Sequence, residues 1–280
     1  MIHMDFVSSF AFLWIYQIPI VNYMKWKNPD LKIHMTGLIG EDYYYKNEHG
    51  IPTIDAYTDV EPNASVRRPC AEHMPFFRSQ PRKYCRTGLY AEDIDENDDF
   101  IIFCSRYHEF HKDLDPNGNR HANSDTDCDL EYLKLLAKEV KVYITGLPGE
   151  CNEFEDIDNV ESIIHVPMKD KPRLLLSLTN KARALVSTAA SSIAVYSMCV
   201  GTPTMCFNLH RHPEKYGAPD GSNRHASLNP FGTYNHCYES IQPDAKYRFE
   251  ETMKFLEASS NTPRFLRDTL IEEDNLAWRW

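Results

Sequence analysis

Residues 184–204 read ALVSTAASSIAVYSMCVGTPT and indicate the α/β class by themselves. The apolar residues 184–187 predict a buried strand, residues 191–200 predict a helix that ends at Gly201, and residues 204–207 predict the next strand. Small residues between strand and helix leave the first amides of the helix accessible, so Ser191 and Ser192 are candidate ligands for a diphosphate. An ordinary helix N-cap explains the same residues equally well, and both interpretations stay open.

The alternation of apolar runs and helical patterns continues on both sides of this stretch. It predicts an α/β protein with two Rossmann-like domains, each with a parallel sheet. Expected strands lie at 2–8, 31–38, 51–57, 100–105, 141–145, 163–166, 184–187 and 204–207. The first expected helix follows the first strand and ends at residue 24. The others lie at 127–138, 171–181, 191–200 and 244–258, and a last one follows Pro263. The acidic run 92–99 suggests a linker. We therefore expect an N-terminal domain at 1–96, a second domain at 97–258 and a C-terminal helix at 259–280 that packs back on the first.

Composition excludes several classes of protein. The 280 residues are 42% hydrophobic and 25% charged, which is typical of a globular chain and not of a disordered one. A net charge of −11 argues against general attraction to polyanions. The apolar residues 6–20 are too few for a membrane span and lack the basic start of a secretory signal, so we expect a cytoplasmic protein without a membrane partner. The eight cysteines form no C-x-x-C pair and the histidines are scattered, so no metal site is expected.

A local basic stretch interrupts this acidic chain at residues 66–86. It holds one acid, Glu72, and interleaves its cations with Phe76, Phe77 and Tyr84. Cations beside aromatic rings suit a phosphate-rich partner with rings that can stack, so DNA, RNA or a phosphorylated glycan is expected. Ion pairing with the acidic run 92–99 is the open alternative. The candidate acceptor-binding residues are Arg67, Arg68, Arg78, Arg82, Lys83 and Arg86.

Several motifs occur in the order found in one enzyme family. These are Ser8-Ser9 and Pro19 followed by NPDLKI at 28–33, the strand 100–106, VYITGLPG at 142–149, the segments 166–168 and 174–188, and the helix that ends VGTPT. Together they resemble heptosyltransferase-type glycosyltransferases of the two-domain GT-B fold. The resemblance implies an active site in the cleft between the domains, a nucleotide-diphosphate sugar as co-substrate and no required metal.

Strand ends and this resemblance supply the candidate donor-binding residues. Residues just after the carboxyl ends of parallel strands face the ligand crevice. This position gives four of the candidate donor-binding residues. The resemblance adds the turn after 141–145 and the residue that follows Val166-Pro167. Together with Ser191 and Ser192, the candidates are Ser105, Arg106, His210 and His212 from the strand ends, and Thr145, Gly146 and Met168 from the resemblance.

The chain departs from the family pattern at its catalytic groups. Ala190, Ser191 and Ser192 stand where the family has Asp-Ser-Gly, Val195 replaces its histidine, and no acid lies near Phe12. The base has therefore moved, or the chain is not a catalyst. Candidate bases are Asp42 and Glu41 after the second strand, with Asp5 in the first strand as runner-up.

The function expected from these features is transfer of a sugar from a nucleotide-sugar to a hydroxyl of a polyanionic acceptor, with inversion at the anomeric carbon. The favoured acceptor is 5-hydroxymethylcytosine in bacteriophage DNA, which such an enzyme would flip out of the stack. Alternatives are a saccharide acceptor of the lipopolysaccharide type, a non-catalytic nucleotide-binding module and a sugar-nucleotide epimerase.

Overall fold

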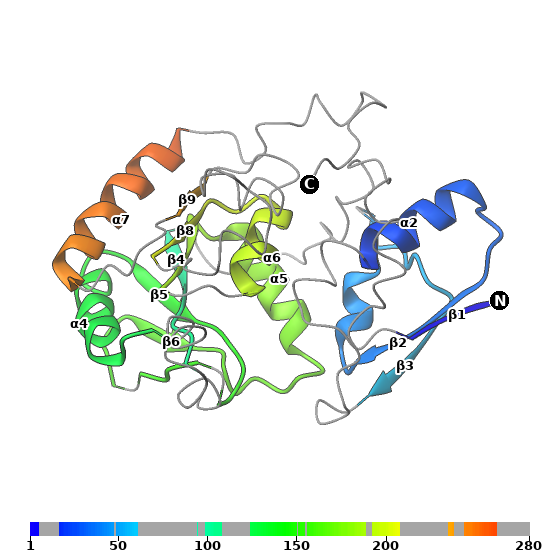
Figure 1. Ribbon diagram of the computed structural model, residues 1–280, viewed down its shortest axis with the longest axis horizontal. Helices are drawn as coiled ribbons and strands as arrows, with labels where there is room; N and C mark the ends of the chain where they lie inside the picture. Colours follow the sequence, from blue (N-terminus) through cyan, green and yellow to red (C-terminus); the bar gives the residue numbers. More distant parts are fainter. Residues whose placement is uncertain are drawn as a thin grey trace, which may run out of the picture.

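The computed structural model describes residues 1–5, 17–47, 49–60, 94, 99–107, 124–149, 151–154, 156–188, 192–207, 235–237 and 244–261. Within these ranges the chain forms two parallel sheets (Figure 1). The first has the order β1-β2-β3, from β1 (Ile2–Asp5), β2 (Ile33–Leu38) and β3 (Ala56–Val60). The helix α2 (Ile18–Lys27) precedes β2, and the short 3-10 helix η2 (Glu41–Tyr44) follows it.

The second sheet has six parallel strands in the order β6-β5-β4-β7-β8-β9. Counted from β4 this order is 3-2-1-4-5-6, the arrangement of a dinucleotide-binding Rossmann sheet. The strands are β4 (Phe100–Cys104), β5 (Lys141–Ile144), β6 (Val160–Ser162), β7 (Ala184–Ser187), β8 (Thr204–Cys206) and β9 (Asn235–Cys237). The helices are α4 (Thr126–Leu136), α5 (Lys171–Lys181), α6 (Ser192–Val200) and α7 (Ala245–Ser260).

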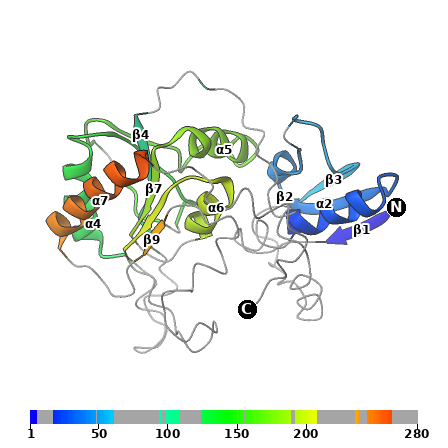
Figure 2. The same ribbon diagram turned by 90° about the horizontal axis from the view of Figure 1, so that it is seen from above.

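The central strand β4 is buried on both faces, which explains its unbroken apolar sequence. Ile101 and Phe103 pack in one core with α4 and α7, whereas Phe100 and Ile102 pack in another with α5 and α6. This second core continues through α2 and η2 into the first sheet. Figures 1 and 2 accordingly show α5 and α6 between the six-stranded sheet and the N-terminal elements.

The structure corrects several expected elements. The strand expected at 163–166 lies at Val160–Ser162, and the strand expected at 51–57 lies at Ala56–Val60. Ile163 and Ile164 are fully or almost fully buried in a turn, and a buried apolar pair in a turn gives the same sequence signal as a short strand. Strand β9 is not among the expected strands, because its three residues form no apolar run. The helix expected after Pro263 lies outside the described residues, and no helix among those described is long and apolar enough to cross a membrane.

Candidate functional site

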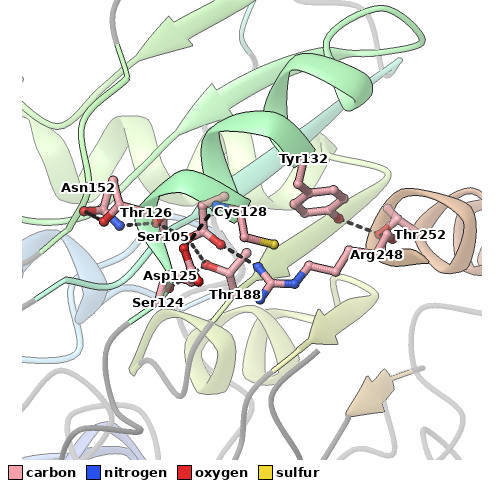
Figure 3. Close-up of polar contacts among 11 residues, drawn as sticks. Ser105, Ser124, Asp125, Thr126, Cys128, Tyr132, Asn152, Thr188, Arg248 and Thr252 are labelled. Atoms are coloured by element: carbon pink, nitrogen blue, oxygen red, sulfur yellow. Dashed lines mark hydrogen bonds and ion pairs between the residues drawn. The ribbon is translucent and has the colours of Figure 1, made fainter. Parts of the chain in front are cut away.

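The strand order of the six-stranded sheet reverses between β4 and β7, and ligands of such sheets bind beside the carboxyl ends of these strands. Ser105 follows β4 and Thr188 follows β7, and both are buried. Both hydroxyls donate to Oδ2 of Asp129 from α4, and the Thr188 bond measures 2.6 Å. Figure 3 shows this buried polar network at the point where a ligand would be expected.

Two further side chains connect the network to neighbouring loops. Asn152 Nδ2, from the segment after β5, donates to Ser105 Oγ at 2.8 Å. Ser124, just before α4, pairs its hydroxyl with that of Thr188 at 2.6 Å. The network therefore connects the loops after β4, β5 and β7 with the start of α4. It holds these loops in fixed relative positions beneath any ligand bound at this edge.

Arg248 from α7 completes the network with a buried ion pair. Its Nη1 lies 2.6 Å from Asp129 Oδ1, and the two side chains are 1% and 0% exposed. Burial raises the pKa of Asp129, while the hydroxyls of Ser105 and Thr188 and the Arg248 guanidinium oppose that rise. Because an unpaired buried charge is costly, removal of either partner would disturb this edge of the sheet.

A pocket of about 360 Å³ lies where the N-terminal elements meet the loop before α5. Its lining residues are Ile39, Gly40, Asp42, Tyr57, Asp59 and Lys169. Gly40 has φ +85°, and a Cβ at this position would lie 2.6 Å from the carbonyl oxygen of Met168. Glycine is therefore required here both for its backbone conformation and for the close approach of the two parts.

Glu41 lies beside this pocket and is 9% exposed. Its Oε2 accepts a hydrogen bond from the Leu38 amide at 3.2 Å. Burial raises the pKa of Glu41 to about 7, and the Leu38 amide opposes that rise. The Tyr57 hydroxyl donates to the Leu38 carbonyl at 3.0 Å. This turn thus holds a buried carboxyl that can exchange a proton near neutral pH, between Gly40 and Asp42, which line the pocket.

The predicted site residues are distributed over these two features. Asp42 lines the pocket and Glu41 adjoins it, whereas Asp5 ends β1 opposite Thr36. Met168 contacts the pocket wall at Gly40. The hydroxyl of Ser105 is occupied within the buried network, so the residue acts here on the loops around it.

The remaining donor candidates lie near the network or outside the described residues. Thr145 is buried after β5, with its amide bonded to the Phe103 carbonyl. The Gly146 carbonyl accepts from the buried Lys171 amine at 2.9 Å. Arg106 is half-buried, and its backbone forms an isolated antiparallel β-bridge with Cys151. Ser192 is the first residue of α6. The residues outside the described ranges are Ser191, His210, His212 and all six acceptor candidates, Arg67, Arg68, Arg78, Arg82, Lys83 and Arg86.

Sequence reasoning missed Asp129, Thr188, Arg248 and Lys169. Thr188 had a usable signal, because it directly follows a buried strand at the switch point. Asp129 and Arg248 are 119 residues apart and look like ordinary helix charges in the sequence. Among the described residues, no group of three or more His, Cys, Asp or Glu could hold a metal ion.

The fold of the chain is similar to that of several solved structures. No family model and no curated protein matches the chain. Among solved structures, ADP-heptose LPS heptosyltransferase II of E. coli matches with a TM-score of 0.55 and 10% identity, over 92% of this chain and 99% of that one. E. coli heptosyltransferase WaaC with ADP matches with a TM-score of 0.51 and 9% identity, over 91% and 99%. The chain therefore has the α/β fold with parallel sheets that these proteins share.

Proposed function

We propose that the chain is a glycosyltransferase that moves a sugar from a nucleotide-sugar to a hydroxyl of a saccharide acceptor. The observation that supports this most is the fold match, which extends over nearly the whole of both chains. One of the matching structures, again of WaaC and with a TM-score of 0.51, contains ADP-2-deoxy-2-fluoro heptose. Since a fold can host several activities, the match supports the proposal and the site chemistry has to carry it further.

The donor is assigned to the second domain, residues 97–258, at the carboxyl edge of β4 and β7. The start of α6 at Ser192 lies after β7, and the free amides of a helix start stabilise a diphosphate. The acceptor is assigned to the N-terminal domain, residues 1–96, with residues 259–280 as a C-terminal helix that packs back on it. The pocket between Asp42 and Lys169 is then the acceptor side of the active site.

The reaction requires one base and one stabilised leaving group. The base takes the proton of the acceptor hydroxyl, the acceptor oxygen bonds to the anomeric carbon, and the bond from that carbon to the diphosphate oxygen breaks. Amides at the start of α6 would stabilise the released negative charge. Asp42 is the preferred base because it lines the pocket, and Glu41 is the alternative because its pKa is about 7. Attack from the side opposite the diphosphate inverts the anomeric centre.

The names of the structural neighbours favour a saccharide over the expected DNA acceptor. The first is named an ADP-heptose LPS heptosyltransferase. The basic stretch that suggested DNA lies outside the described residues. Hydroxymethylated DNA is therefore kept as one arm of the acceptor test, and a non-catalytic module is the outcome if a donor binds but no sugar is transferred.

The proposal is tested first by thermal unfolding with a panel of nucleotide-sugars, including ADP-sugars. A donor at about 100 times its Kd stabilises the folded chain by about 2.7 kcal/mol, which is a clear shift in Tm. The stabilising donor is then incubated with saccharide and DNA acceptors while nucleoside diphosphate release is measured. We expect Asp42→Asn to lower turnover at least 100-fold if Asp42 is the base. If no nucleotide-sugar stabilises the chain, the proposed function is wrong.

A further inference from the structure

The junction pocket contains charged groups whose hydrogen-bonding capacity is unused. Asp42, Asp59 and Lys169 are exposed and line the same pocket. Among the described residues, none of these three side chains forms a hydrogen bond or ion pair with another side chain. Asp42 lies in η2, just after β2, and Asp59 lies near the end of β3. Lys169 comes from the loop before α5. A molecule in the pocket would therefore contact both parts of the chain at once.

The walls of the pocket are fixed by two glycines. A Cβ at Gly37 would lie 2.2 Å from the Tyr57 hydroxyl, so only glycine lets this tyrosine donate to the Leu38 carbonyl. Gly40 allows the backbone of Met168 and Lys169 to approach as closely as described above. The tyrosine hydroxyl is thus already used, and its ring is held at the pocket wall. The pocket wall therefore contains one anchored aromatic residue and three charged groups.

The charge balance of this wall selects among ligands. Two aspartates face one lysine, and the buried Glu41 adds negative charge as it ionises. Such a wall repels a phosphate or carboxylate group on a ligand and attracts an ammonium group. Carboxylates accept hydrogen bonds from sugar hydroxyls, and the ammonium of Lys169 donates to a hydroxyl or ring oxygen. The volume of about 360 Å³ is at the lower end of the range for small-ligand pockets.

We propose that this pocket binds one uncharged or amine-bearing sugar residue and discriminates against phosphorylated sugars. This inference rests on the proposed function, for which it names the chemical class of the acceptor. Asp59 and Asp42 bind the hydroxyl or ammonium groups of the sugar, Lys169 binds an oxygen from the opposite wall, and Tyr57 packs against its ring. The sugar that receives the transferred group is thus held at the turn that carries Asp42 and Glu41.

The test compares three probes on the full chain by ligand-observed NMR: glucosamine, methyl β-glucoside and glucose 6-phosphate. We expect glucosamine and methyl β-glucoside to bind, and glucose 6-phosphate to bind at least 10-fold more weakly than glucosamine. Asp59→Lys reverses one wall charge. It should weaken glucosamine about 5-fold and improve glucose 6-phosphate about 5-fold, since one exposed charge contact contributes up to about 1 kcal/mol.

Asp30→Lys is the matched control, because Asp30 is exposed in the turn before β2, at the end away from the pocket. It should leave all three affinities within twofold of the unchanged chain. Equal or tighter binding of glucose 6-phosphate by the unchanged chain overturns the proposal, and so does the absence of any sugar binding. Nucleotide-sugar binding is measured separately by thermal shift. Sugar binding without donor binding would refute the proposed function and leave this pocket assignment standing.

Discussion

Glu41 illustrates how one buried carboxyl affects both stability and chemistry. In the unfolded chain it titrates near its ordinary pKa of 4.5, but burial raises the pKa to about 7 in the folded chain. The folded state therefore binds more protons than the unfolded state between these two pH values. Because of this difference, the free energy of unfolding decreases as the pH rises from about 4.5 to 7. The same property gives a proton acceptor with a pKa near working pH.

The Glu41→Gln variant should remove this pH dependence. We expect the unchanged chain to lose up to about 3 kcal/mol of stability relative to the variant between pH 4.5 and pH 7.5. Urea unfolding of both proteins at these two pH values measures the difference. Asp42→Asn, a change of an exposed neighbour that leaves Glu41 in place, is the control and should keep the pH dependence of the unchanged chain. A constant stability difference between Glu41→Gln and the unchanged chain would contradict the burial of an ionisable Glu41.

At the scale of single elements, the sequence predicts best where local signals agree. Helix α5 lies at the expected residues 171–181, because Pro172 favours a first turn and the leucines repeat with helical spacing. Strands β6 and β9 could not be located from the sequence. Each has only three residues, and each forms by pairing with a neighbouring strand, β5 or β8. The residues of the polar network differ in the same way, because local signals locate some of them and only tertiary packing locates the others. Ser105 follows from the position of a strand, whereas Asp129 and Arg248 become partners only when α7 packs on α4.

The pairing of α4 with α7 depends on Arg248. We expect Arg248→Met to lower the free energy of unfolding by about 3–5 kcal/mol, because Asp129 remains buried without its counter-charge. Lys246→Met on the same helix is the matched control. Its amine is 3.9 Å from Glu250 at the surface, and its removal should change stability by less than about 1 kcal/mol. Urea unfolding followed by circular dichroism compares the two. Equal stability of both variants would show that the buried pair does not hold α7.

On the scale of the whole molecule, one apolar core joins the two sheets. Tyr44 from η2 and Tyr196 from α6 are at most 1% exposed, and their ring centroids are 6.1 Å apart. The same core includes Ile33 of β2 and Ile102 of β4. The N-terminal elements therefore cover the apolar surface of α5 and α6, and their described residues share one core with these helices (Figure 2). This explains how a first sheet of only three described strands is stable beside the larger one.

A shared core predicts that both sheets unfold together. Tyr196→Ala removes a fully buried ring and should lower the free energy of unfolding by about 3–5 kcal/mol. Hydrogen exchange should then become faster in β1–β3 as well as in α6, because the lost ring packs against both parts. Tyr247→Ala, which changes a tyrosine that is 40% exposed on α7, is the control and should leave exchange in β1–β3 unchanged. Faster exchange confined to α6 would mean that the N-terminal sheet is stable by itself. The pocket at Gly40 would then lie between independently folded parts. A ligand bound there would have to hold the two parts together by its own binding free energy, which is the role that the shared core is expected to have.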